Sequence, residues 1–127
     1  AIDMAGAVME GVSFVLRKNC DHIAANGVKL SSIIATGGGA KSAIWCQMQA
    51  DITGIPVSIP AEKEAACLGA AMIAAVCHGK FADLREAADQ SVKIAKQYEP
   101  NPQPRLETKY RRFCKLYEAA MALNDIV

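Results

Sequence analysis

The chain has 127 residues, of which 52% are hydrophobic and 21% are charged, and its formal net charge at pH 7 is +1. This length suits one domain with a buried core, and the near-neutral charge excludes the basic surface that nucleic-acid binding requires. No apolar run approaches the roughly 20 residues of a membrane span, and no signal-peptide pattern opens the sequence. We therefore expect a globular, cytoplasmic protein that binds neither nucleic acid nor a membrane.

The first predicted element is a long amphipathic helix over residues 3–25, with apolar residues at three- and four-residue steps. Asp3 is expected to cap its start, and Asn26-Gly27 to end it. Gly11, in its interior, suggests close packing against another backbone. Glu10 is either a solvated helix charge or a residue that faces a cleft, and it is not assigned to a site.

The second predicted element is a buried strand within residues 28–36, apolar on both faces as expected of a parallel strand covered by helices. Gly37, Gly38 and Gly39 follow it directly, and a helix over residues 42–53 comes next. Glycine has no Cβ, so a ligand can approach this backbone closely, and the positive end of the next helix favours phosphate oxygens. The same pattern also fits a tight turn that binds nothing.

Residues 42–53 should form a helix that ends at Gly54, with Ile44, Met48 and Ile52 in the core. Trp45 is assigned to packing, although it could stack on an adenine ring. Gln47 and Asp51 lie one turn apart and are expected to bond each other. Ser42 either caps the helix or donates its hydroxyl to a nucleotide, and Lys41 is assigned to solvent.

The remaining elements are a strand over residues 55–59, a helix over 65–78, a short helix after Asp83, and a final helix over 106–125. The alanine- and glycine-rich helix 65–78 should approach the first strand and the first helix closely. Residues 92–98 are either extended or a helix tail. The prolines in residues 98–104 exclude a helix there and indicate a strap across the surface. An apolar stripe on the final helix should pack on the body of the domain or against the first helix.

Two well-known glycine motifs can be tested on this stretch. A Walker phosphate loop needs glycines where Ala35 and Ala40 stand, so that motif is excluded. A dinucleotide fingerprint would use Gly37 and Gly39, but its third glycine falls on Ser42. Glu62 and Glu64 stand about 20 residues further on, where a ribose-binding carboxylate would be expected. A nicotinamide-binding dehydrogenase domain therefore stays open as an alternative.

The cysteines and the titratable residues predict no metal site. The segment Cys20-Asp21-His22 cannot converge on one ion, because adjacent residues on a helix point to different faces. The five cysteines are widely spaced, without any CxxC pair, and we expect them to be reduced packing residues. They are Cys20, Cys46, Cys67, Cys77 and Cys114.

Several ordered segments together resemble the C-terminal lobe of the FGGY carbohydrate kinases. The resemblance covers most of the chain and is densest over residues 10–75. Within the family, the sequence is most similar to the xylulose kinases. The matching segments are Met9 to Phe14 with Leu16 and Arg17, Gly37 to Ser42, Trp45 to Met48, Ala50 to Gly54, Pro56-Val57, Pro60, Glu64-Ala65 and Leu68 to Ala71.

This resemblance implies an α/β fold: an actin-like ATPase (ribonuclease H-like) lobe fragment with short parallel strands packed by several helices. Residues 1–127 would be the C-terminal, ATP-binding lobe fragment of a sugar kinase that uses ATP and Mg²⁺. The implied nucleotide site is the glycine turn against the adenosine-phosphate portion, with one serine as a polar contact. These residues are Gly37, Gly38, Gly39, Ala40 and Ser42.

The resemblance also implies what the chain lacks. It assigns no catalytic residue and no Mg²⁺ ligand to this sequence. The implied partners are a missing N-terminal lobe of the same enzyme and a small-molecule sugar similar to xylulose. A homodimer is left open. Because the base and the sugar pocket would lie outside these residues, we expect the isolated fragment to be inactive. A non-catalytic actin-like association module is a further alternative.

Overall fold

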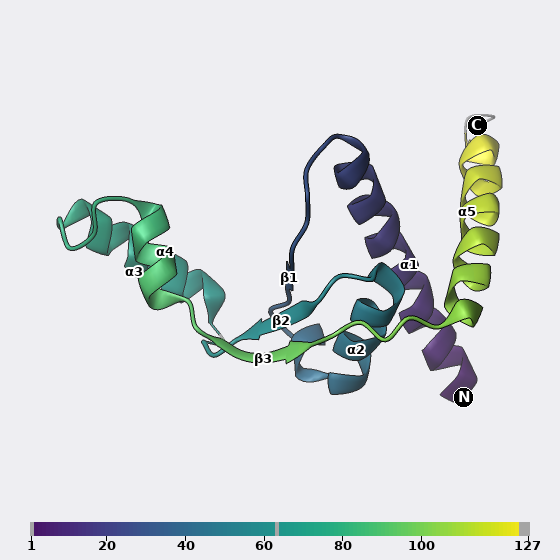
Figure 1. Ribbon diagram of the computed structural model, residues 1–127, viewed down its shortest axis with the longest axis horizontal. Coiled ribbons are helices and arrows are strands. Elements are labelled where there is room, and N and C mark those ends of the chain that lie inside the picture. The colour runs from purple at the N-terminus through teal and green to yellow at the C-terminus, as the bar shows by residue number, and fades with distance from the viewer. Residues whose placement is uncertain (1, 63, 125–127) are drawn as a thin grey trace.

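The computed structural model describes residues 2–62 and 64–124, which form helices around a small sheet (Figure 1). Within these residues the sheet has three strands in the order β1-β2-β3, with β1 parallel and β3 antiparallel to β2. The predicted α/β class is confirmed, and the third strand makes the sheet mixed. The elements are α1 (Ile2–Ala25), β1 (Ile33–Ile34), the 3-10 turn η1 (Gly39–Lys41), α2 (Ala43–Thr53), β2 (Val57–Pro60), α3 (Ala65–Cys77), α4 (Leu84–Ser91), β3 (Ile94–Tyr98) and α5 (Pro104–Asn124).

The parallel pair β1–β2 positions the glycine turn. Ile33 pairs with Val57, and the Ala35 N–H extends the ladder by donating to the Ser58 carbonyl at 3.0 Å. β1 lies at the edge of this sheet, and Ile34 is 52% exposed. The expectation that the first strand is buried on both faces is therefore wrong for the described chain, because no element of it covers the outer side of Ile34.

Helix α2 is the centre of the packing. Ser42 caps it, with the side-chain oxygen accepting from the Trp45 N–H at 3.3 Å, and Gly54 ends it in the left-handed region at a φ of 70°. One side of α2 contributes Ile52 to a core shared with α1 and α5, and another side contributes Cys46 to a core shared with β2. Ile44, expected in the core, is 75% exposed, so that prediction is wrong for the described chain.

Helices α1 and α5 cross and hold each other through an aromatic cluster. The ring of Phe14 lies 5.8 Å from that of Tyr110 and 5.5 Å from that of Phe113. Arg17 binds Glu107 at 2.7 Å beside this cluster. The predicted docking of the final helix against the first is thus confirmed at the crossing, while Leu116, further along the stripe, is exposed.

Two expectations for α1 are wrong. Asp3 lies inside the first helical turn and does not occupy the capping position. Gly11 meets no heavy atom within 4 Å of where a Cβ would stand, so no other backbone approaches it in the described chain. Glu10, left open between solvent and a cleft, accepts from Lys109 of α5 at 2.7 Å.

Helices α3 and α4 form a hairpin at the opposite end of the molecule from α1 and α5 (Figure 1). Asp83 caps α4 by accepting from the Glu86 N–H at 2.9 Å, as predicted. α3 contacts α4, and a Cβ at Gly69 would meet nothing within 4 Å. The expectation that α3 packs closely on the first strand and helix is therefore wrong, because the hairpin projects away from both.

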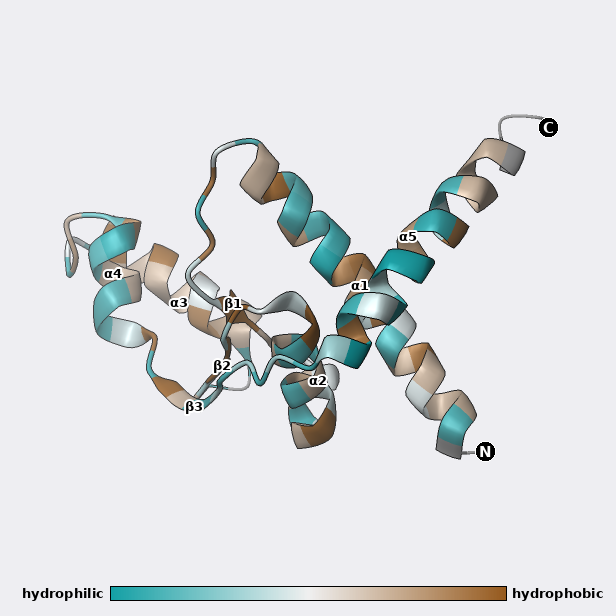
Figure 2. Cartoon of the chain, turned by 45° about the vertical axis from the view of Figure 1, so that its right-hand side comes forward, coloured by the Kyte–Doolittle hydropathy of each residue, from teal (hydrophilic) through white to brown (hydrophobic). Residues whose placement is uncertain are grey.

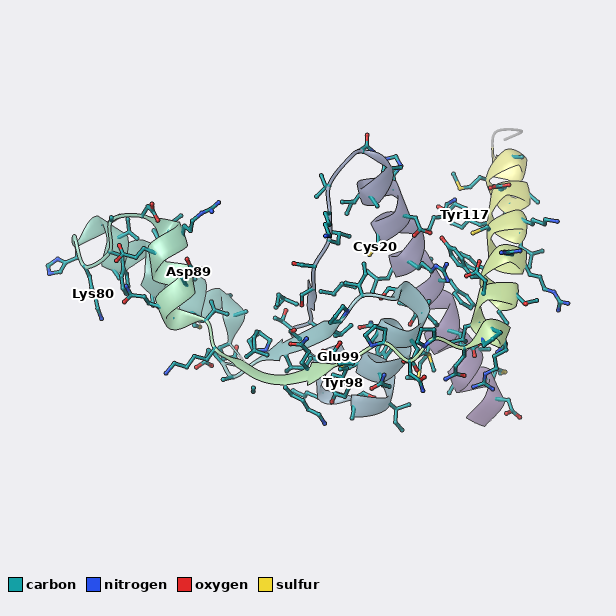
Figure 3. All side chains as sticks on the ribbon, in the orientation of Figure 1. Cys20, Lys80, Asp89, Tyr98, Glu99 and Tyr117 are labelled. Carbon is teal, nitrogen blue, oxygen red and sulfur yellow. The ribbon has the colours of Figure 1, made fainter. Side chains whose placement is uncertain are left out.

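Residues 99–103 form the predicted strap, which crosses α2 between β3 and α5. The Gln47 side chain donates to Asp51 at 2.8 Å, as predicted, and also to the Glu99 carbonyl at 2.7 Å. Asp51 accepts from the Asn101 N–H at 2.9 Å. Figure 3 labels Tyr98 and Glu99 where β3 passes into the strap beside α2. Of the helices in residues 2–62 and 64–124, none is long and apolar enough to cross a bilayer.

Candidate functional site

A hollow of about 580 Å³ lies where the two parallel strands end. The segment that follows β1 forms one wall, the end of β2 and the segment after it form another, and Ala95 of β3 adds to a third. In open α/β sheets, ligands bind in the crevice beyond the carboxyl ends of the strands. The lining residues are Ala35, Thr36, Gly37, Gly38, Ala40, Lys41, Ile59, Pro60, Ala61, Glu62, Glu64 and Ala95.

The glycine turn has a defined backbone conformation. Gly37 has a φ of 77°, in the left-handed region that side-chain-bearing residues rarely adopt, whereas Gly38 has an ordinary right-handed conformation at a φ of −63°. The N–H groups of Lys41 and Ser42 donate to the carbonyls of Gly38 and Gly39 at 3.2 and 3.1 Å. Any backbone N–H of the turn that donates to a ligand must therefore come from Gly37 to Ala40.

The first turn of α2 supports the glycine turn from behind. The Trp45 ring lies 3.4 Å from the position that a Cβ on Gly39 would take. The Cys46 thiol shares its one proton between the carbonyls of Gly39 and Ala40, which lie 3.8 and 3.7 Å from its sulfur. Burial raises the pKa of Cys46 above its ordinary value, which keeps the thiol protonated as a donor.

The structure separates the five predicted nucleotide-binding residues into two groups. Gly37, Gly38 and Ala40 line the hollow, whereas Gly39 faces Trp45 and Ser42 caps α2. The contact of all five with a nucleotide stays a prediction. Lys41, assigned to solvent, lines the rim of the hollow and is exposed.

Trp45 takes the packing role assigned to it. Its ring lies against Gly39 and not among the residues that line the hollow. Its indole Nε1 is buried and has no hydrogen-bond partner in the part of the chain that the structure describes.

Sequence reasoning missed several lining residues. Ile59 and Pro60 end β2 and Ala61 follows it, and Ala95 comes from a strand whose place in the sheet was not predicted. The signal that could have found the first group is the carboxyl end of the second parallel strand, since such ends meet at one edge of a sheet. Ala95 carries no such signal, because its position depends on the antiparallel pairing of β3 with β2.

Two carboxylates come from the wall of the hollow that follows β2. Glu62 and Glu64 both line it, and the Glu64 N–H donates to a Glu62 carboxylate oxygen at 3.1 Å. Among the described residues, no three His, Cys, Asp or Glu side chains gather closely enough to hold a metal ion. All five cysteines are free.

The profile of the FGGY family of carbohydrate kinases, C-terminal domain, matches residues 1–78, which is more than half of the chain. The chain belongs to the FGGY family of carbohydrate kinases. The matched FGGY residues include the glycine turn, α2, both parallel strands and the two carboxylates at the hollow, but not β3 or α5. The match supports the kinase interpretation over the nicotinamide-binding one.

This FGGY chain is 43% identical over 96 residues to an autoinducer-2 kinase from Yersinia enterocolitica, an alignment that covers 75% of the chain and 18% of that relative. The chain thus spans about a fifth of the length of such curated relatives.

Solved FGGY structures share the fold described here. A ligand-bound xylulose kinase from Lactobacillus acidophilus aligns with a TM-score of 0.77 and 34% identity, over 95% of this chain and 24% of that one. A xyloylose kinase from Brucella ovis aligns with a TM-score of 0.81 and 29% identity, over 94% and 25% of the two chains. The predicted actin-like lobe fragment is therefore confirmed.

Proposed function

We propose that this chain forms the nucleotide-holding part of an ATP-dependent carbohydrate kinase, which transfers the γ-phosphate of ATP to a sugar hydroxyl. The observation that carries the proposal is the glycine-lined hollow at the carboxyl ends of β1 and β2. Its volume of about 580 Å³ falls in the range of small-molecule sites. Phosphoryl transfer depends mainly on positioning and on charge stabilisation, so a preformed nucleotide-binding hollow is a substantial part of such an enzyme.

In this proposal the turn residues have different tasks. Gly37, Gly38 and Ala40 meet the adenosine-phosphate portion of ATP, because they line the hollow and two of them lack a Cβ. Gly39 and Ser42 hold the turn against α2. Lys41, at the rim of the hollow, offers a positive charge to a phosphate group.

The remaining parts of the reaction are assigned to other regions of the kinase. The base that accepts the sugar hydroxyl proton, the Mg²⁺ ligands and the sugar pocket would come from an N-terminal lobe and the earlier part of this lobe. The apolar face of α1 supports such a partner, since Met4, Val8 and Val12 are exposed there (Figure 2). ATP and sugars are available in the cytoplasm, which is where we place the enzyme.

Two sugar classes are candidates for the acceptor. The amino-acid sequence of the glycine turn and of α2 favours a xylulose-like pentulose, in line with the structural neighbour from L. acidophilus. The 43% identity to the Y. enterocolitica protein favours autoinducer-2 as the second candidate. The proposal places the choice between them in the sugar pocket, which is assigned to another region of the kinase.

The test is a phosphorylation assay on the full-length protein with ATP, Mg²⁺ and a panel that contains xylulose, other pentuloses and autoinducer-2. We expect ATP-dependent phosphorylation of one of these sugars, and no turnover by residues 1–127 alone. Turnover by the isolated chain would contradict the assignment of the base to a missing lobe. A full-length protein that prefers NAD to ATP and phosphorylates no sugar would contradict the kinase proposal.

A further inference from the structure

The glycine turn has few internal hydrogen bonds, and a side chain outside the hollow contributes to its conformation. Cys46 is 1% exposed and lies in the first turn of α2. Its Sγ is 3.8 Å from the Gly39 carbonyl and 3.7 Å from the Ala40 carbonyl. The Gly39 carbonyl also accepts from the Ser42 N–H at 3.1 Å, so it is held from two sides.

These contacts fix the direction of the peptide between Gly39 and Ala40. In a trans peptide the carbonyl and the following N–H point in opposite directions, and no cis peptide occurs in the described chain. Because the Gly39 carbonyl points at Cys46, the Ala40 N–H points away from α2. Ala40 is itself a lining residue of the hollow.

We propose that Cys46 is a positioning residue, which acts through the glycine turn to present the wall of the hollow to the nucleotide. This inference rests on the proposed function of the hollow as the ATP site. Cys46 itself does not touch the ligand, since it lies behind Gly39 and Ala40 and is not among the lining residues.

The chemistry of the side chain is suited to this role. A thiol donates a hydrogen bond only when protonated, and burial raises the pKa of Cys46. Valine fills a similar volume without a donor, whereas serine keeps a donor on a slightly shorter side chain. The pair Cys46→Val and Cys46→Ser therefore separates hydrogen bonding from packing.

The experiment measures KM for ATP, KM for the sugar, kcat and the thermal unfolding midpoint on the full-length protein and its variants. Cys20→Val is the matched control, because Cys20 is also a buried helical cysteine but lies on α1, away from the turn. We expect Cys46→Val to raise KM for ATP by about two- to fivefold, the effect of one weak hydrogen bond. We expect kcat, KM for the sugar and the unfolding midpoint to stay near their wild-type values.

The outcomes are distinct. Recovery of the wild-type KM for ATP in Cys46→Ser, with Cys20→Val unchanged, supports the role. An unchanged KM for ATP in Cys46→Val, in a wild type that uses ATP, overturns this inference alone. A rise in KM for ATP that Cys20→Val shares, or that Cys46→Ser does not recover, also overturns it. A wild type that neither binds nor consumes ATP overturns the proposed function and this inference with it.

Discussion

Alanine substitutions at two adjacent glycines of the turn should differ in their effect on stability. Gly37 and Gly38 both line the hollow, and a Cβ at either would meet nothing within 4 Å. They differ in conformation, because Gly37 has a φ of 77° and Gly38 a φ of −63°. Any difference between Gly37→Ala and Gly38→Ala therefore reports backbone strain and not steric overlap.

The magnitude follows from two contributions. An L-residue in the left-handed region costs about 1–2 kcal/mol, which applies to Gly37→Ala only. Replacing glycine by alanine also removes about 0.4–1 kcal/mol of unfolded-state entropy, which applies to both variants and cancels in their difference. We expect Gly38→Ala to unfold at equal or higher urea concentration than the wild type, and Gly37→Ala to be about 1–2 kcal/mol less stable than Gly38→Ala.

The assay is urea unfolding of the full-length variants followed by circular dichroism, combined with KM for ATP. Gly38→Ala should weaken ATP binding without loss of stability, because Gly38 lines the hollow and an added methyl group would hinder the close approach of a nucleotide to this backbone. Equal stability of the two variants would refute the assigned conformation of Gly37. An unchanged KM for ATP in Gly38→Ala would refute close approach of the nucleotide to this backbone.

Further predictions concern the contacts that hold α1, α2 and α5. Phe14 is buried where α1 meets α5, so Phe14→Ala should lower the free energy of unfolding by about 3–5 kcal/mol, and Phe14→Leu should lower it clearly less. A decrease under about 1 kcal/mol for Phe14→Ala, measured by thermal unfolding, would contradict this packing. Hydrogen bonds from Arg17 and Arg111 lower the pKa of Glu107, so its stabilising effect is present above pH 4.5 and is lost as the pH falls through the lowered value. Glu107→Gln should therefore flatten the acid limb of the pH–stability profile, and an unchanged limb would count against the ion pairs. Asp51→Ala should accelerate hydrogen exchange at the Asn101 N–H, whereas Asp89→Ala on α4 should not; equal exchange in both would show that Asp51 does not hold the strap.

Local signals in the sequence predicted local structure well. The cap at Asp83 and the glycine stop at Gly54 are confirmed, because each depends on residues within one turn of the helix end; of the two roles left open for Ser42, the structure shows the cap. The bond between Gln47 and Asp51 is confirmed for the same reason. The family and the class of fold were predictable because the ordered segments that carry the resemblance lie mainly within the matched residues 1–78.

Features that depend on distant contacts were not predictable. The pairing of β3 with β2, which brings Ala95 to the hollow, joins segments more than thirty residues apart. The close packing of Gly11, Ile44 and α3 was inferred from apolar or small residues, yet in the described chain Gly11 meets no other backbone, Ile44 is exposed, and α3 packs on α4 and not on β1 and α1. The alignment covers 18% of the Y. enterocolitica relative, and in the proposed kinase a larger lobe would cover such apolar surface.

The candidate site shows the same division. Pattern alone identified the glycine turn but could not say which glycines face the hollow, because Gly39 is turned toward Trp45 by packing in α2. Nor could it identify Cys46 as a donor to the turn, since cysteines on apolar stripes usually only pack. Three-dimensional contacts therefore decided which residues line the site and which support it.

The most direct test of nucleotide binding at the glycine turn is a crystal structure of the full-length protein with a non-hydrolysable ATP analogue and Mg²⁺. We expect the adenosine-phosphate portion to lie in the hollow, against the backbone of Gly37, Gly38 and Ala40. Nucleotide density elsewhere, with the hollow filled by neighbouring side chains, would contradict it.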